Sequence, residues 1–306
     1  MQEIIQKKDK IKGSINLELT INSGQTSQAP WFKEDESYKQ IITVKNTPCI
    51  VKISENEDEL IINYNSFDKI NKKDVKDKVN YIFNLDFDLN KLYEYLENNP
   101  RLSKTTEFCE GLRLFLANDP WEAIVSSISS ANNSILRWTR SNLDMRKMFG
   151  TPYTFDNEIY YSFPDIKTMV DLPLIGDCGR DLRACGLGYR DKYIIESAKI
   201  ISTMDLNEFF KLDYNQAFKE ISKLPGVGPK VADCILLYGF DFQEAFPSDV
   251  WIKRIINHLY FDGKSDLTTK KVREFGISEF NEYAGYVQLY LFHYARCSGL
   301  LDTLKK

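Results

Sequence analysis

The sequence lacks the features that would mark a membrane or secreted protein. Its 306 residues contain no apolar run of membrane-spanning length, and the opening MQEIIQKKDK has no apolar signal-peptide segment. Internal repeats and low-complexity linkers are also missing. With 43% hydrophobic residues, the chain can bury a sizeable core, so we expect one or two globular domains in a cytoplasmic protein.

Cysteine and histidine are few and do not occur at metal-ligand spacings. The two histidines, His258 and His293, match no zinc pattern, so we expect no catalytic metal. No CxxC pair occurs, which in a cytoplasmic protein favours reduced thiols over disulfides. The six cysteines are Cys49, Cys109, Cys178, Cys185, Cys234 and Cys297.

The chain has no excess of basic residues. Its 40 Lys and Arg against 44 Asp and Glu give a net charge of −4, which argues against a surface dominated by phosphate binding. Nucleic-acid binding stays open, because helix N-termini bind phosphate without basic side chains and basic residues can gather in the fold. The candidates for such a gathering are Arg137, Arg140, Arg146, Lys147, Arg190, Lys192, Lys253 and Arg254.

Apolar periodicity divides the chain into a strand-rich and a helix-rich part. Segments 15–21, 41–44, 49–53 and 60–64 have strand character, whereas 71–78 is a charged turn or short helix on a solvated face. Helices are expected at 121–131, 137–149, 190–202, 213–224, 229–239, 250–260 and 279–297, and the chain is expected to fray from about residue 296. We predict an α+β fold, with an N-terminal antiparallel sheet domain with short helices (1–117) packed on a mostly helical body (118–306).

A glycine-rich turn, Leu224-Pro225-Gly226-Val227-Gly228-Pro229, separates two of these helices. Pro225 and Gly226 end the first helix, and Pro229 suits the first position of the second. The free amides and the helix dipole at the N-terminus of the second helix favour the binding of an anion there. Segment 213–239 therefore predicts a helix-hairpin-helix motif that holds a DNA phosphate, although a plain helix connection would look similar.

Two reactive side chains accompany the hairpin. Lys230 lies in the first turn of the second helix, where the dipole and burial are expected to lower its pKa, as a nucleophilic amine requires. Cys234 shares its helix face. Asp249, in the turn 246–251, is expected to be an N-cap or first-turn residue whose carboxylate stabilises nearby positive charge. An amine and a carboxylate beside such a hairpin indicate covalent chemistry on a nucleotide; alone, each has an ordinary structural explanation.

These motifs resemble the helix-hairpin-helix DNA glycosylases, and among them the 8-oxoguanine DNA glycosylase/AP lyases. Matching segments occur in family order at 23–25, 132–137, 186–190 and 283–292. The resemblance implies a base-excision repair enzyme that flips 8-oxoguanine out of duplex DNA. Lys230 would attack C1′ and expel the base, and the resulting Schiff base would permit strand cleavage by β-elimination. Asp249 would stabilise cationic character at the sugar.

The resemblance also assigns the recognition of the damaged base. The Gly24 carbonyl would accept N7–H of 8-oxoguanine, whereas guanine would face it with a bare acceptor. Gln288 would contact the Watson–Crick edge, and Phe292 would stack on the flipped base opposite Cys234.

On the opposite strand, Asn132 would enter the stack beside the orphaned cytosine. Arg137 and Arg190 would bind that cytosine through its acceptors, and Tyr189 would act as a wedge. The phosphate-binding positions of the hairpin would be Gly226, Gly228 and Val231. The resemblance further implies a structural cation at the backbone carbonyls of Ser222, Leu224 and Val227.

The chain departs from its relatives at two positions, and it lacks the cysteines of one subfamily. Animal and fungal enzymes have a phosphate-binding histidine where this chain has Trp251, and Ser134 replaces a third asparagine after Asn132. Relatives with an iron–sulfur cluster have four cysteines after the aspartate helix, but only Cys297 lies beyond Asp249, so no such cluster is expected. No cofactor is expected for catalysis.

Two other functions fit parts of the sequence. A monofunctional alkylpurine DNA glycosylase would share the sheet and hairpin, but that class uses water and lacks the lysine at position 230. A non-catalytic helix-hairpin-helix module would bind DNA and form no product. We expect a monomer whose partner is double-stranded DNA that contains 8-oxoguanine opposite cytosine.

Overall fold

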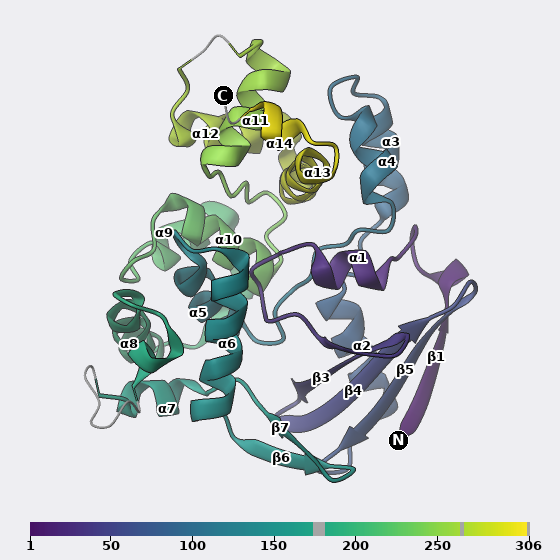
Figure 1. Cartoon of the computed structure of the whole chain (residues 1–306), viewed down its shortest axis with the longest axis vertical. Coiled ribbons are helices and arrows are strands. Elements are labelled where there is room, and N and C mark those ends of the chain that lie inside the picture. Colours follow the sequence, from purple (N-terminus) through teal and green to yellow (C-terminus); the bar gives the residue numbers. More distant parts are fainter. Residues whose placement is uncertain (174–180, 264–265, 305–306) are drawn as a thin grey trace.

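The computed structural model describes residues 1–173, 181–263 and 266–304. A five-stranded antiparallel sheet, in the order β1-β5-β4-β3-β2, forms one side of the molecule (Figure 1). Its strands are β1 Gln2–Lys7, β2 Phe32–Glu34, β3 Ser37–Val44, β4 Thr47–Glu55 and β5 Glu59–Ser66. The antiparallel N-terminal sheet predicted from the sequence is therefore confirmed, and the three apolar segments at 41–44, 49–53 and 60–64 are its central strands.

One face of the sheet is covered by α2 (Lys72–Ile82). Val75, Val79 and Ile82 are buried there against strand residues such as Ile53 and Ile62, which pair in register on β4 and β5. Of the two alternatives expected at 71–78, a charged turn or a short helix, the helix is the one present, and its charged residues occupy the outer face. Its apolar residues recur at helical spacing on the inner one.

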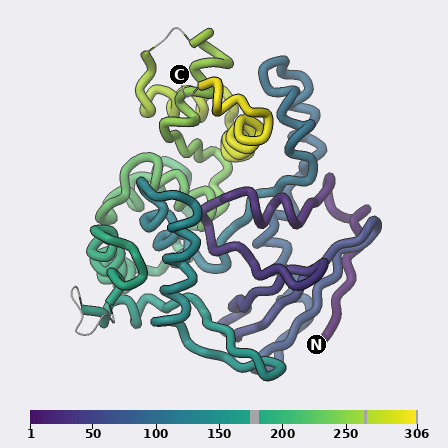
Figure 2. Tube along the Cα trace, in the orientation of Figure 1, coloured from purple at the N-terminus to yellow at the C-terminus, as the bar shows by residue number. Residues whose placement is uncertain are grey.

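The prediction of a strand at 15–21 was wrong. Leu17–Asn22 forms the helix α1, which begins where the Asn16 side chain accepts a hydrogen bond from the Leu19 amide at 2.8 Å. Alternating apolar residues suggested a strand, but the buried members of α1 are Leu17, Thr20 and Ile21, the spacing of a helix face. Figure 2 follows the chain from α1 toward α6 and back to the sheet.

The rest of the chain is a helical body with one small hairpin. Its helices are α3 Leu89–Glu97, α4 Thr106–Cys109, α5 Pro120–Ser130, α6 Ile135–Phe149, α7 Ile166–Asp171, α8 Arg190–Ile201, α9 Tyr214–Ile221, α10 Pro229–Phe240, α11 Val250–Phe261, α12 Thr269–Phe280, α13 Ala284–Cys297 and α14 Leu300–Thr303. The hairpin is β6 Pro152–Phe155 with β7 Glu158–Tyr161.

Most predicted helices are present within a few residues of their expected bounds. Helices α7 and α12 and the hairpin β6–β7 were not predicted. The helix expected at 279–297 begins later than predicted. Asn281, at φ 49°, ends α12, and the next long helix, α13, starts at Ala284. Residues 300–303 form α14, so this stretch is not frayed.

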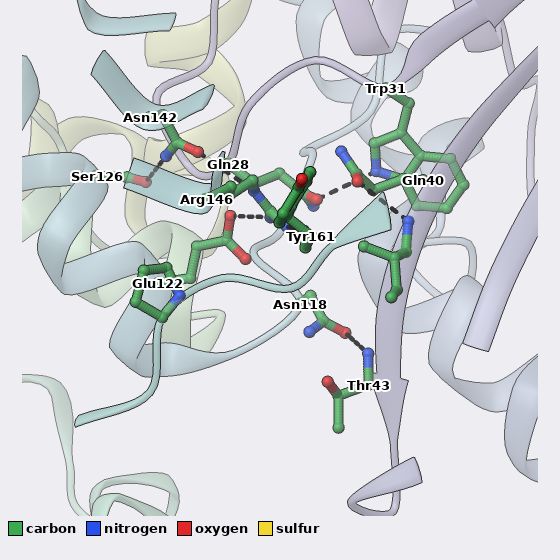
Figure 3. A network of polar contacts seen from close by, with 12 residues as sticks. Gln28, Trp31, Gln40, Thr43, Asn118, Glu122, Ser126, Asn142, Arg146 and Tyr161 are labelled. Carbon is green, nitrogen blue, oxygen red and sulfur yellow. Dashed lines mark hydrogen bonds and ion pairs between the residues drawn. The ribbon is translucent and has the colours of Figure 1, made fainter. Parts of the chain in front are cut away.

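Polar contacts join the sheet to the body and hold α5 and α6 together (Figure 3). The Asn118 side chain accepts from the Thr43 amide of β3 at 3.2 Å. Arg146 of α6 pairs with Glu122 of α5 at 2.5 Å, with both side chains buried, and it also donates to the Tyr161 carbonyl at 3.4 Å. Removing one member of a buried ion pair costs about 3–5 kcal/mol, so this pair holds the end of α6 against the start of α5.

Within the described part of the chain, no helix is both long enough and apolar enough to cross a bilayer. The five cysteines described are free, and four of them are buried. Cys178, the sixth, lies outside the described residues. The division at 117/118 stays a prediction, although a sheet layer and a helical body are both present.

Candidate active site

The glycine turn between α9 and α10 has two glycines with different structural roles. Gly226 has a φ of +76°, and a Cβ there would lie 2.4 Å from the Tyr193 ring, so conformation and packing both require glycine. Gly228 caps α10 at an ordinary φ of −86°. Among the described residues, nothing lies within 4 Å of a Cβ placed at Gly228. The turn thus leaves an open approach to the amides at the start of α10, as a helix-hairpin-helix phosphate site requires.

Lys230 lies in the first turn of α10, and Cys234, which is 3% exposed, follows one turn later. Burial acts to lower the pKa of the Lys230 amine, but the negative charges of Cys234 and Asp249 act the opposite way and prevail. The pKa of Lys230 therefore lies above its ordinary value, and the prediction of a lowered pKa was wrong. The sequence indicates the helix dipole and the burial that would lower this pKa, but it does not indicate the acidic neighbours that the fold places beside the amine.

The thiol beside Lys230 titrates in the same environment. Burial raises the pKa of the Cys234 thiol above its ordinary value, against the opposing attraction of Lys230. Lys230 must lose a proton before it can act as a nucleophile.

Asp249 is the N-cap of α11, as predicted. Its Oδ1 accepts from the amides of Trp251 and Ile252, each at 2.9 Å. This leaves the carboxylate fixed at a helix start and turned toward the same cavity as Lys230. Lys230 and Asp249 thus line one cavity from two different helix starts.

A cavity of about 770 Å³ brings together residues from distant parts of the sequence. Its walls come from the 23–26 segment, the turn before α6, α10, the 247–251 turn and α13. The predicted site residues on its lining are Gly24, Asn132, Gly226, Lys230, Val231, Cys234, Asp249, Gln288 and Phe292. Those outside the lining are Gly228, Arg137, Tyr189, Arg190, Ser222, Leu224 and Val227. The cavity is large enough for a nucleobase and contains the proposed nucleophile.

The predicted opposite-strand residues surround the turn before α6. Asn132 has a left-handed φ of 50°, and Arg137 is exposed in the first turn of α6. Tyr189 is 54% exposed beside the Arg190 guanidinium, which lies 4.6 Å from its ring centroid. Arg190 itself is buried and donates to the carbonyls of Ala131, Asn132 and Leu187. It therefore ties the start of α8 to the turn that carries Asn132.

The hairpin contains one observation relevant to a structural cation. The buried Ser222 hydroxyl has no hydrogen-bond partner among the described residues, whereas the Leu224 carbonyl already accepts from the Val227 amide at 3.1 Å. An oxygen without a partner beside exposed turn backbone fits a bound cation. Elsewhere in the described residues, no cluster of three or more His, Cys, Asp or Glu could hold a metal.

Several residues around the site were not predicted from the sequence. Tyr238 lines the cavity and lies one turn beyond Cys234, so helical spacing could have identified it. Asp233, fully buried beside Cys234, pairs with Arg273 at 2.6 Å and accepts from the Tyr214 hydroxyl at 2.6 Å. Arg273 lies on α12, a helix that was not predicted, and nothing in the sequence signals this pairing.

Family comparisons agree with this geometry. Residues 7–124 match the N-terminal domain of 8-oxoguanine DNA glycosylase, and residues 125–279 match the HhH-GPD superfamily of base excision DNA repair proteins. A "Probable N-glycosylase/DNA lyase" of Methanothermobacter thermautotrophicus is 42% identical over 96% of this chain and 97% of its own length. The chain belongs to the HhH-GPD superfamily of base excision DNA repair proteins. Within it, the chain is an enzyme of the 8-oxoguanine DNA glycosylase group, of N-glycosylase/DNA lyase type.

Solved structures show the same architecture. The 8-oxoguanine glycosylase/lyase of Clostridium acetobutylicum, in complex with double-stranded DNA containing cytosine opposite 8-oxoguanine, superposes with a TM-score of 0.81. It is 29% identical and covers 97% of this chain and 98% of its own. The 3-methyladenine DNA glycosylase of Archaeoglobus fulgidus reaches a TM-score of 0.80 at 22% identity, with 97% and 99% covered. The fold is thus shared with an alkylpurine enzyme, and the site residues must distinguish the two.

Proposed function

We propose that this enzyme excises 8-oxoguanine opposite cytosine in duplex DNA and then cleaves the strand at the resulting site. The observation that carries the proposal is the shared cavity, where Lys230 and Asp249 lie with Gly24, Gln288 and Phe292. Such a combination provides a nucleophile, a charge-stabilising group and base-binding groups in one enclosure. The water-using alkylpurine reading explains neither the lysine nor its interacting thiol.

Binding would begin at the hairpin. The amides at the start of α10 would hold a phosphate, with the open space at Gly228 allowing the DNA backbone to approach. Because C1′ is inaccessible inside a duplex, the damaged nucleotide would rotate into the cavity. Asn132 and Tyr189 would fill the space left in the stack. This mode of binding is compatible with the net charge of −4, since backbone amides do much of the phosphate contact.

Base recognition would combine one backbone contact and three side-chain contacts. The Gly24 carbonyl would accept the N7–H that 8-oxoguanine has and guanine lacks. Gln288 would bind the Watson–Crick edge, while Phe292 and Cys234 would cover the two faces of the base. Opposite the lesion, Arg137 would donate to cytosine. Arg190 uses three of its five N–H groups on carbonyls, which leaves donors for cytosine as well.

Chemistry would start with loss of a proton from Lys230, whose pKa lies above its ordinary value. The neutral amine would form a bond to C1′ while the bond from C1′ to N9 of the base breaks and the base departs with that electron pair. Asp249 would stabilise the positive character at the sugar. Ring opening then gives a Schiff base, and loss of a C2′ proton expels the 3′ phosphate by β-elimination.

Three further features belong to the proposal. A structural cation would bind at the hairpin through the carbonyls of Ser222, Leu224 and Val227 without taking part in the reaction. The protein would act as a monomer. A repair enzyme of this kind would work on chromosomal DNA in the cytoplasm.

Borohydride trapping tests the proposal directly. A duplex with a single 8-oxoguanine opposite cytosine is incubated with wild type and with Lys230→Gln. An adduct in wild type alone, with damaged-DNA binding retained by the variant, supports a Schiff base at Lys230. Base release without any adduct would favour the water-using alkylpurine class. Neither adduct nor base release would leave a DNA-binding module or another lesion as the better account.

A further inference from the structure

A short loop, Ser23-Gly24-Gln25, presents Gly24 to the cavity between two buried neighbours. Ser23 and Gln25 are 3% and 6% exposed, whereas Gly24 is partly exposed and lines the cavity. Its φ is +87°, in the region that favours glycine. Glycine adopts many backbone conformations at little cost, so its own sterics cannot fix the direction of its carbonyl. Contacts from elsewhere must do so.

Contacts on one side of the loop come from Gln25. Its Nε2 donates to the Ser23 hydroxyl at 3.0 Å and to the Arg113 carbonyl at 2.9 Å, and its Oε1 accepts from the Phe115 amide at 2.9 Å. These bonds hold the loop to the segment that follows α4. They fix the end of the loop after Gly24 but make no contact with the peptide group before it.

Arg296 makes the contact on the other side. It lies in the last turn of α13, and its Nη1 donates to the Ser23 carbonyl at 2.7 Å, the length of a strong charge-assisted bond. That carbonyl belongs to the peptide group joining Ser23 to Gly24. A Cβ placed at Gly24 would lie 3.0 Å from Arg296 Nη1, so the guanidinium packs closely against the glycine.

The same arginine connects the loop to the base-binding face of α13. Arg296 is one helical turn beyond Phe292, and its guanidinium lies 5.9 Å from the Phe292 ring centroid. Phe292 lines the cavity, as does Gln288 one turn earlier. Arg296 thus joins the two elements that would bind the damaged base. These elements are far apart in sequence, since Ser23 and Arg296 are 273 residues apart.

We infer that Arg296 is a positioning residue for lesion discrimination: by holding the Ser23 carbonyl, it sets the direction of the Gly24 carbonyl relative to Phe292 and Gln288. This inference rests on the proposed function, because it assigns the discrimination to the Gly24 carbonyl. It concerns base recognition alone. Cleavage of a preformed abasic site involves no base and should not depend on Arg296.

The experiment compares two rates in each of four proteins. Single-turnover excision of 8-oxoguanine opposite cytosine is measured beside cleavage of a preformed abasic site, in wild type, Arg296→Met, Arg296→Lys and Arg101→Ala. Methionine keeps an unbranched stem beside Phe292 and removes the donor. Arg101 is the matched control, since its Nε donates to the Leu259 carbonyl at 3.0 Å and its guanidinium lies 5.1 Å from the Tyr260 ring centroid.

Arg296→Met is expected to lower the ratio of the excision rate to the abasic-site cleavage rate roughly tenfold. This is the effect of losing one hydrogen bond from a charged donor, because about 1.4 kcal/mol corresponds to a factor of ten. Arg296→Lys should recover part of this ratio, and Arg101→Ala should leave it unchanged. Binding to abasic-site DNA should stay within twofold of wild type in all four proteins.

Three results would overturn the inference. A parallel fall of both rates in Arg296→Met would show that the arginine supports the fold. An unchanged ratio would show that Gly24 is positioned without it, and weakened binding to abasic-site DNA would make Arg296 a phosphate contact. Failure of the proposed function looks different. Wild type itself would then release no 8-oxoguanine, and the inference would fall with the proposal.

Discussion

Arg273→Met tests how the active-site helix α10 is held in place. Wild-type Arg273 binds both oxygens of the fully buried Asp233, at 2.6 and 3.0 Å, and its guanidinium lies 4.0 Å from the Phe218 ring centroid. Methionine preserves much of the contact with Phe218 but removes the positive charge. Asp233 would keep the Tyr214 hydroxyl as its hydrogen-bond donor.

The expected loss of stability is about 3–5 kcal/mol, the usual cost of leaving one member of a buried ion pair without its partner. For a domain near 200 residues, each kcal/mol shifts the Tm by roughly 2–4 °C, so a fall of about 10 °C is expected. Lys270→Met is the control on the same helix. Its exposed pair with Glu274, at 3.9 Å, should be worth less than about 1 kcal/mol.

The loss should also depend on pH. Burial raises the pKa of Asp233, and Arg273 is the strongest influence against that rise, so removing Arg273 raises the pKa further. A folded-state pKa above the unfolded value means that the folded variant binds the extra proton. Its stability relative to wild type should therefore fall as pH rises from the folded-state pKa of Asp233 in wild type to the higher one in the variant, by up to about 1.4 kcal/mol per pH unit.

Thermal and urea unfolding of wild type and both variants at pH 5 and pH 8 would measure this. The deficit of Arg273→Met should be larger at pH 8. A deficit below about 1 kcal/mol, or one of equal size at both pH values, would refute the view that this arginine neutralises a buried carboxylate.

Four other substitutions test the site itself. Cys234→Ala removes the largest upward influence on the pKa of Lys230, so the acidic limb of the pH–rate profile for abasic-site cleavage should move to lower pH; a shift to higher pH would contradict the assigned coupling. Gly226→Ala should cost about 1–3 kcal/mol in unfolding experiments, from its φ of +76° and the tight packing there. Gly228→Ala should leave stability within about 0.5 kcal/mol of wild type and weaken DNA binding in a titration, unless no phosphate approaches that position. Gly24→Ala should slow 8-oxoguanine excision more than abasic-site cleavage, and equal losses would make Gly24 a residue of the fold rather than of recognition.

Local patterns in the sequence were sufficient for much of the fold. The central strands have apolar runs bounded by turn residues, and Asp119 before Pro120 marks the start of α5 as a cap and a first-turn proline should. Asp249 was identified as a helix start in the same way. These features depend on a few neighbouring residues, which the sequence displays directly.

Other features depend on contacts between distant segments. The alternation in α1 fits a strand and a helix equally well, and packing decides between them. The high pKa of Lys230 arises from charges that the fold gathers around one amine. Arg190 resembled a free base-binding arginine, yet its contacts with Ala131 and Asn132 appear only once α8 meets the turn before α6.

The cavity has a consequence for how a new chain becomes active. Its lining runs from Ser23 near the N-terminus to Phe292 near the C-terminus, so both ends of the sequence must be in place before it exists. A ribosome-bound chain in which Lys230 has already been synthesised still lacks α13, and therefore lacks part of the cavity wall. A partly synthesised or truncated chain therefore has Lys230 but not the complete cavity around it. Proteolytic loss of the last helices should likewise abolish catalytic activity, and not merely reduce the specificity for the damaged base.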